Sequence, residues 1–125
     1  MLVVYGMNGM DELSLSGESM VGELVNGQIR EYVVHPADFG MPVYDSRVLR
    51  VADVDASKAK VYEALDNVEG PVRDIVLLNA GAALYAAQVC ASISEGVTLA
   101  REAVASGAAR AKLEQFVRIT RQLAE

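Results

Sequence analysis

Strand-like patterns occupy the first third of the chain. Residues 2–5 are a continuous apolar run rich in β-branched side chains, which predicts a short buried strand of the kind found in parallel sheets. Two more strand-like runs cover residues 19–25 and 28–34, with Asn26 and Gly27 between them. Because both residues of a tight hairpin turn must accept positive φ, the Asn-Gly pair at this place predicts a β-hairpin.

A helical period replaces the strand pattern from residue 55 onward. Val61, Tyr62 and Leu65 recur at the spacing of one helix face, which predicts an amphipathic helix packed through that face. Asp55 or Ser57 is expected to cap its start, because a short polar side chain can accept a hydrogen bond from the first free backbone amides.

The next predicted helix is the most apolar part of the chain. Gly70 and Pro71 mark its start, since glycine suits the end of one helix and proline the first turn of another. From Pro71 to about Cys90 the chain is apolar nearly all round, which predicts a helix about 30 Å long through the middle of the fold. Residues 75–93 approach the length of a membrane span, but alanine dominates and Asn79 interrupts the run, so we interpret them as core.

Two further helices are predicted after this one. Ser92 and Glu95 have the spacing of a capping box that opens a third helix, and Gly107 is expected to end it. The apolar face of a last amphipathic helix consists of Ala109, Leu113, Phe116, Val117 and Leu123. The fold class is therefore expected to be α/β: a short buried strand and an Asn-Gly hairpin followed by about four helices.

The predicted helices carry more apolar surface than one strand and a hairpin can cover. A buried strand that begins at residue 2 also has nothing before it to pair with it or to cover it. We therefore expect residues 1–125 to form a single partial α/β domain, with the rest of that domain upstream.

Composition and charge narrow the classes of partner. Hydrophobic residues make up 52% of the 125 residues, which is enough for a packed core. The formal net charge of -6 argues against nucleic acid or an anionic membrane surface as the main partner. A phosphorylated ligand stays possible, because it needs only local positive charge or a metal ion. Cys90 is the single cysteine, which excludes an internal disulfide and is typical of a reducing, cytoplasmic compartment.

A glycine-flanked acidic loop follows the first predicted strand. It contains the adjacent carboxylates Asp11 and Glu12 between Gly9 and Gly17. Ligand chemistry in open α/β sheets usually lies in loops at strand ends, and Mg²⁺ binds one or two carboxylates while keeping water for a phosphate partner. The residues alone leave two readings open: a divalent-cation site, or solvated loop acids that repel each other.

Other polar residues suggest mainly structural roles. His35, the only histidine, stands at a strand end, where structural or solvated histidines are common. Arg30 and Arg47 could contact a phosphate, but an exposed or ion-paired role is the more usual one for such side chains. Asn79 is interpreted as a satisfied amide inside the apolar helix, and Cys90 as an inert thiol in the core.

Taken together, these segments resemble the anthranilate phosphoribosyltransferase family, in its C-terminal portion. The matching segments are Val3-Val4-Tyr5-Gly6, Gly9-Met10-Asp11-Glu12-Leu13-Ser14, Ile29-Arg30-Glu31-Tyr32, Pro36-Ala37-Asp38-Phe39-Gly40, Arg73-Asp74-Ile75-Val76-Leu77-Leu78-Asn79-Ala80, Ala82-Ala83-Leu84-Tyr85, Glu95-Gly96 and Ser106-Gly107-Ala108-Ala109. Each segment alone is short, but their ordered combination covers essentially the whole chain. The resemblance implies the C-terminal part of a mixed-sheet domain of the nucleoside phosphorylase and phosphoribosyltransferase superfamily.

The resemblance also implies a Mg²⁺-dependent transfer in tryptophan biosynthesis. In the family, phosphoribosyl pyrophosphate donates its phosphoribosyl group to the amine of anthranilate and releases pyrophosphate. The metal-binding acidic pair of the family falls on Asp11 and Glu12. The family's glycine-rich phosphate loop and its N-terminal helices have no counterpart in these residues, so no catalytic residue is assigned and the isolated chain is expected to be inactive.

Three interpretations remain at this point. The chain is a half-enzyme that works with an N-terminal half, whether covalently attached or supplied as a separate chain. Alternatively, it is a non-catalytic remnant or interaction module that self-associates or binds a partner through uncovered apolar surface. The third interpretation is an α/β fragment without a present function. Restored turnover on mixing with an N-terminal half separates the first interpretation from the others.

Overall fold

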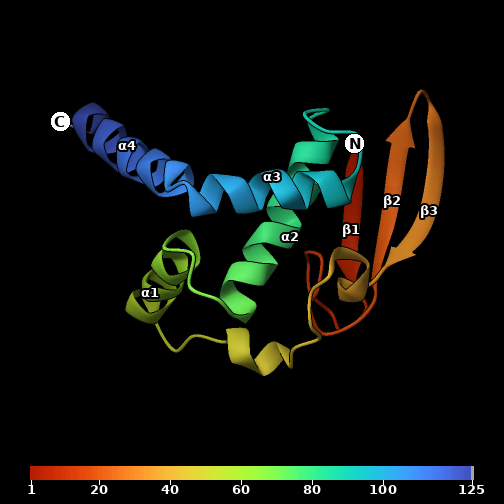
Figure 1. The fold of residues 1–125 in the computed structure, drawn as a ribbon, viewed down its shortest axis with the longest axis horizontal. Helices are drawn as coiled ribbons and strands as arrows, with labels where there is room; N and C mark the ends of the chain where they lie inside the picture. The colour runs from red at the N-terminus through yellow and green to blue at the C-terminus, as the bar shows by residue number, and fades with distance from the viewer. Residues whose placement is uncertain (125) are drawn as a thin grey trace.

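A computed structural model describes residues 1–124, with a three-stranded sheet on one side of four helices (Figure 1). The elements are β1 (Leu2–Gly6), β2 (Ser19–Val25), β3 (Gln28–Val34), two short 3₁₀ helices η1 (Pro36–Phe39) and η2 (Ser46–Leu49), α1 (Val54–Leu65), α2 (Pro71–Ala86), α3 (Ile93–Ala105) and α4 (Ala108–Leu123). The predicted α/β class, with a strand and a hairpin before four helices, is confirmed.

The sheet is antiparallel throughout, in the order β1-β2-β3. Val25 is paired with Gln28, and Asn26 and Gly27 between them have φ values of 51° and 76°. Both turn residues are thus in the left-handed region that a two-residue hairpin turn of this kind requires.

The prediction of a fully buried, parallel-type β1 is wrong. Leu2 and Val4 pack against the core, whereas Val3 and Tyr5 are 66% and 52% exposed. Successive side chains of a strand point to opposite faces, and within the described chain the helices cover only one face of this sheet. The continuous apolar run therefore reflects two apolar faces, of which one is open.

The central helix α2 contributes the largest share of the core. Its buried residues are Val72, Asp74, Ile75, Leu77, Leu78, Gly81 and Ala82. Pro71 begins it as expected, but it ends at Ala86 rather than near Cys90. Gln88 has a φ of 61°, a left-handed conformation that a continuing helix cannot contain.

The boundaries of α1 also differ from the prediction. Asp53, rather than Asp55 or Ser57, is the N-cap, and its carboxylate accepts a hydrogen bond of 2.8 Å from the amide of Ala56. Val61, predicted to lie on the buried face, is exposed, and Ala64 is the buried residue of this helix. The packing face of α1 is therefore rotated from the one that the apolar spacing indicated.

Helices α2 and α3 cross with their backbones in contact at two glycines. A Cβ atom added to Gly81 would lie 2.6 Å from the backbone nitrogen of Val97, and one added to Gly96 would overlap the carbonyl oxygen of Gly81. Both glycines are buried. The α2–α3 pair thus depends on the absence of side chains at this crossing.

The C-terminal helices are joined by a tight turn. Ser92 caps α3 by accepting from the amide of Glu95 at 3.1 Å, while the Glu95 carboxylate accepts from Ala91. Gly107, with a φ of 78°, lies between α3 and α4. Helix α4 has no buried residue and extends away from the sheet (Figure 1). None of the helices described for residues 1–124 is long and apolar enough to cross a membrane.

Candidate functional site

The acidic loop begins with a tight turn at the end of β1. The amide of Gly9 donates to the carbonyl of Gly6 at 2.8 Å, and the amide of Gly6 donates to the carbonyl of Met10 at 2.9 Å. A Cβ atom on Gly6 would lie 2.9 Å from the side-chain oxygen of Asn8 and 3.1 Å from the Cβ atoms of Met10 and Ser14, so the turn leaves little room for a side chain at this place. These bonds fix the point at which Asp11 leaves the strand end.

Asn79 of α2 anchors the backbone that directly follows the acidic pair. Its side-chain oxygen accepts from the backbone amide of Leu13 at 2.9 Å, and its side-chain nitrogen donates to the Leu13 carbonyl at 3.0 Å. The same nitrogen also donates to the carbonyl of Ile75 at 3.1 Å. One amide side chain thus satisfies both backbone groups of the residue directly after Glu12.

Buried leucines fasten the same loop to the core. Leu13 and Leu15 are fully buried and belong to one apolar cluster with Leu77 and Leu78. Between them, the amide of Ser14 donates to the Ser19 hydroxyl at 2.9 Å. The loop is therefore rigidly anchored immediately after the carboxylates.

The acidic pair itself faces outward from this anchored segment. Asp11 is exposed and Glu12 is half-buried. Partial burial, and secondarily the adjacent Asp11 carboxylate, raise the pKa of Glu12 above its ordinary value. Within residues 1–124, neither carboxylate forms an ion pair. A cation at this place would relieve both the burial cost and the mutual repulsion.

The donor set fits a magnesium ion that shares its coordination with a phosphate. Among the residues described, no group of three or more His, Cys, Asp or Glu side chains could hold a metal. Two carboxylate groups, Asp11 and Glu12, do not make a protein cage, but Mg²⁺ commonly uses one or two carboxylates and completes its octahedron with water and substrate phosphate oxygens.

The remaining candidate residues have structural surroundings. The His35 ring caps η1 by accepting from the amide of Ala37 at 3.2 Å, and Arg47 pairs with the carboxylate of Asp45. These two structural readings are confirmed, while Arg30 is exposed on β3. The Cys90 thiol does not lie in a helix core: it is partly exposed after the end of α2, with its sulfur 3.4 Å from the Ser92 carbonyl.

The reading of Asn79 as a satisfied amide is confirmed, but the sequence did not show which backbone it satisfies. The only local signal was a carboxamide within an otherwise apolar helix, four residues after Ile75. Its contact with Leu13 spans 66 residues of sequence, so no short-range pattern indicates it.

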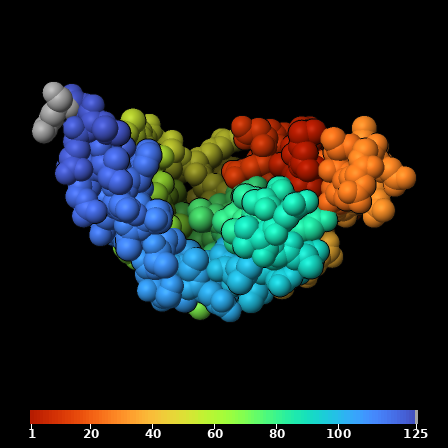
Figure 2. Space-filling view, turned by 90° about the horizontal axis from the view of Figure 1, so that it is seen from above, coloured from red at the N-terminus to blue at the C-terminus, as the bar shows by residue number. Residues whose placement is uncertain are grey.

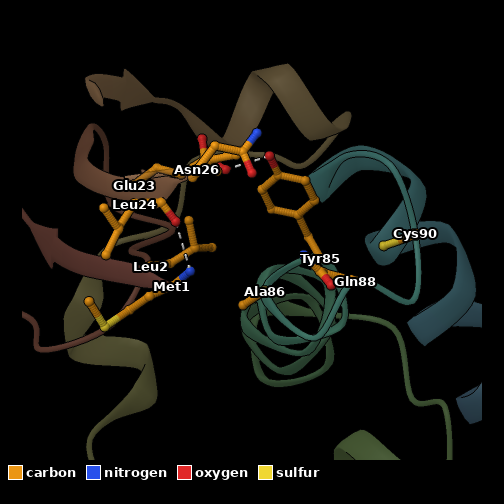
Figure 3. A pocket seen from close by; sticks show the side chains of 10 residues that line it. Met1, Leu2, Glu23, Leu24, Asn26, Tyr85, Ala86, Gln88 and Cys90 are labelled. Atoms are coloured by element: carbon orange, nitrogen blue, oxygen red, sulfur yellow. Dashed lines mark hydrogen bonds between the residues drawn. The ribbon is translucent and has the colours of Figure 1, made fainter. Parts of the chain in front are cut away.

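A second polar cluster lies at the opposite end of β1 (Figure 3). There a pocket of about 330 Å³ contains Glu23 and Tyr85, whose hydroxyl donates to the carboxylate at 2.5 Å. Burial, and then the Glu23 charge, raise the pKa of Tyr32 to about 12. Because Glu23 belongs to β2 and Tyr85 to α2, this hydrogen bond ties the hairpin to the central helix, away from the acidic loop.

Comparison with known proteins assigns the chain to a family. Residues 1–110 match the family described as "Glycosyl transferase family, a/b domain". The chain belongs to the glycosyl transferase family. The resemblance to anthranilate phosphoribosyltransferase is likewise confirmed: the enzyme of Leptothrix cholodnii is 69% identical over 119 residues, 95% of this chain, and that of Methylibium petroleiphilum is 67% identical over 122 residues, 98% of this chain.

Solved structures share the fold. The chain resembles anthranilate phosphoribosyltransferase of Thermus thermophilus with a TM-score of 0.85 and 39% identity, over 96% of this chain and 35% of that one. The Saccharomyces cerevisiae enzyme in complex with PRPP and Mg gives a TM-score of 0.79 at 23% identity, over 94% of this chain and 34% of that one. The chain spans about a third of the length of the curated relatives that it matches.

Proposed function

We propose that this chain supplies the Mg²⁺- and pyrophosphate-binding part of an anthranilate phosphoribosyltransferase. The observation that carries the proposal is the acidic pair Asp11-Glu12, held at the end of β1 by the two hydrogen bonds between Asn79 and Leu13. High identity to anthranilate phosphoribosyltransferases over nearly the whole chain supports the choice of reaction. The substrates of the complete enzyme are then phosphoribosyl pyrophosphate and anthranilate, and the process is tryptophan biosynthesis.

The role of the chain's own residues is positioning. Asp11 and Glu12 would hold the metal through their carboxylate oxygens, while the anchored backbone at Leu13 keeps both carboxylates in place without reorganisation. When bound there, Mg²⁺ would supply positive charge where departing pyrophosphate gathers negative charge. No general acid or base is assigned to these residues, because loss of pyrophosphate from the sugar needs charge neutralisation more than proton transfer.

The proposal includes a requirement for further polypeptide. About two thirds of the length of the matched relatives lies outside the matched region, and residues 1–125 are proposed to be one part of a larger α/β domain. Two carboxylates make a weak site for Mg²⁺ without substrate phosphates and the groups that bind them. The isolated chain is therefore expected not to turn over anthranilate.

A second candidate is a non-catalytic interaction module with the same fold. The open apolar face of β1, with Val3 and Tyr5 exposed, favours binding of another polypeptide whether or not catalysis follows. Under this reading Asp11 and Glu12 are solvated loop acids, and replacing them leaves every binding property unchanged.

The test is complementation with metal binding as a second readout. The chain is mixed with, or fused to, the part of the Leptothrix cholodnii enzyme outside its 119 matched residues, and loss of anthranilate fluorescence is followed with phosphoribosyl pyrophosphate and Mg²⁺. We expect turnover only in the combined protein. Asp11→Asn and Glu12→Gln should each lower it at least about a hundredfold, the order of loss typical of groups that stabilise developing charge.

Glu18→Gln is the matched control, because Glu18 is an exposed carboxylate of the same loop. It should change neither turnover nor the affinity of the combined protein for Mg²⁺ and pyrophosphate, measured by calorimetry. Equal behaviour of the Asp11, Glu12 and Glu18 variants would refute the metal assignment.

A further inference from the structure

The pocket at the start of β1 contains a buried carboxylate. Glu23 is only 8% exposed, and it lines this pocket of about 330 Å³ together with Tyr85 and Gln88. Figure 2 shows the hairpin, in orange, beside the residues at the end of α2, in turquoise, and away from α4, in blue. A carboxylate removed from water costs free energy unless hydrogen bonds and opposite charge replace its hydration. The groups around Glu23 therefore decide what the pocket can bind.

Phenols surround this carboxylate but bring no positive charge. The Tyr85 hydroxyl reaches across from α2 and donates to Glu23 at 2.5 Å (Figure 3). Tyr32, which is paired with Val21, lies on the same face of the sheet as Glu23. An ionised carboxylate has about four acceptor sites, so neutral donors satisfy only part of it and leave its charge uncompensated.

The chain's own cations near the pocket do not neutralise Glu23. Arg30 is its cross-strand partner in the β2–β3 register, but the Arg30 side chain is exposed. The amino group of Met1 lines the pocket and donates to the Leu24 carbonyl at 3.2 Å instead. Among residues 1–124, no ion pair includes Glu23. The buried carboxylate is thus available to a cation from outside the chain.

We propose that this pocket binds a small primary ammonium ion with a short apolar arm. Such an ion has three donors, which suit the Glu23 carboxylate and the side-chain oxygens of Asn26 and Gln88 on the pocket wall. Leu2 and Ala86 also line the pocket and provide apolar contact for the arm. The pocket volume is near the lower end of those usual for ligands, which favours an ion with only a few carbon atoms.

A metal ion suits this pocket less well than an ammonium ion. Glu23 is the single carboxylate that lines it, and the part of the chain that the structure describes contains no group of three or more His, Cys, Asp or Glu that could hold a metal. Divalent cations need more oxygen ligands or a substrate phosphate. The proposal is independent of the phosphoribosyl transfer, because the pocket lies at the other end of β1 from Asp11 and Glu12.

Two ligands of the same shape and different charge test the proposal on the unmodified chain. The 125-residue protein is titrated at neutral pH with n-butylammonium and, separately, with n-butanol, and the amide signals are followed by nuclear magnetic resonance. We expect saturable shifts at Gln88 and Leu24 with n-butylammonium, and an affinity for n-butanol at least about tenfold lower. Equal affinities would overturn the proposal. Shifts centred on Leu13 would place the ion at the acidic loop and would overturn it as well.

Substitutions of charged residues provide the second measurement. Glu23→Gln keeps an acceptor for Tyr85 but removes the charge, and should weaken binding of n-butylammonium at least about tenfold. Glu31→Gln is the matched control, because Glu31 is an exposed carboxylate of the same sheet whose side chain lies on the other face. It should leave the affinity unchanged. Arg30→Gln removes a nearby repelling charge and should tighten binding about twofold.

The outcomes separate the pocket from general attraction to an acidic protein. Equal affinities of the Glu23→Gln and Glu31→Gln variants would refute a site at Glu23, and so would weaker binding in Arg30→Gln. Thermal melting of each variant checks that it folds. The comparison of n-butylammonium with n-butanol needs no variant, so it decides the proposal even where Glu23→Gln unfolds the chain.

Discussion

The two sides of α2 differ although the sequence makes both apolar. Leu78 is 1% exposed and belongs to one apolar cluster with the acidic-loop leucines, whereas Val76 is 38% exposed and lines an open groove. The covered side holds Asn79, the glycine contact with α3 and the anchors of the acidic loop. Within the described residues, α2 is covered on one side and open on the other. The covered side is the one that positions the candidate site.

The glycine crossing should be the most sensitive point on the covered side. In Gly96→Ala the new methyl group meets the backbone of α2 at Gly81, which cannot rotate away as a side chain would. The helices must separate, and we expect a loss of more than about 4 kcal/mol in the free energy of unfolding, among the largest single-substitution effects. Circular dichroism with urea titration measures it.

Gly22→Ala is the control for this variant. Gly22 lies in β2, and an added Cβ would meet nothing closer than the Val3 carbonyl at 3.8 Å. We expect a change of less than about 0.5 kcal/mol. Comparable losses at Gly22 and Gly96 would show that glycine as such, rather than the helix crossing, is what the fold requires.

Truncation of one residue on each side of α2 sharpens the contrast. Leu78→Ala removes a side chain that is only 1% exposed and should cost about 3 kcal/mol of unfolding free energy through lost burial and a residual cavity. Val76→Ala should cost less than about 1 kcal/mol in the isolated chain, because that side chain still touches water. If the two variants unfold at the same urea concentration, the groove is already covered in solution.

Sequence patterns predicted the positions of the secondary-structure elements better than the burial of their side chains. Local signals placed the Asn26-Gly27 turn between two strands, the start of α2 at Pro71 and the acidic pair in a loop, because each depends on nearby residues. The same patterns misjudged β1 and Val61, since an apolar residue looks alike whether the chain or another polypeptide covers it.

Long-range polar contacts were the other feature that the sequence patterns did not predict. Asn79 and Leu13 are 66 residues apart, and Tyr85 and Glu23 are 62 apart. A periodic pattern carries no information about which distant backbone or side chain meets a polar group. The two hydrogen bonds between Asn79 and Leu13, which we call the clamp on the acidic loop, were therefore found only from the structure.

Removing this clamp should destabilise the acidic loop while the apolar packing of the core stays intact. Asn79→Ala leaves the buried amide and carbonyl of Leu13 without partners, and we expect a loss of about 2 kcal/mol in unfolding free energy. Amide exchange at Leu13 should accelerate more than exchange in α3. Asn79→Asp places a carboxylate oxygen against the Leu13 and Ile75 carbonyls, and should destabilise the fold at least as much as Asn79→Ala.

The pH dependence of stability tests the polar cluster on the covered face of the sheet. Tyr32 has a pKa of about 12 in the fold against an ordinary value of 10.0, mainly because of burial and then the Glu23 charge. Its stabilising contribution is therefore complete below pH 10 and is lost as pH rises through about 12, since the unfolded chain releases the phenolic proton first. One proton limits the slope to about 1.4 kcal/mol per pH unit, and partial exposure of the ring to water should reduce it to about 1.

Tyr32→Phe isolates this contribution from the lysines and other tyrosines that titrate in the same range. The free energy of unfolding is measured by urea titration between pH 8 and about pH 11 for both proteins. The parent should lose stability more steeply than the variant, so that their difference changes steadily above pH 10. Parallel curves would mean that the phenol ionises equally easily in both states, and that Glu23 and the ring are hydrated on a face that the structure shows as covered.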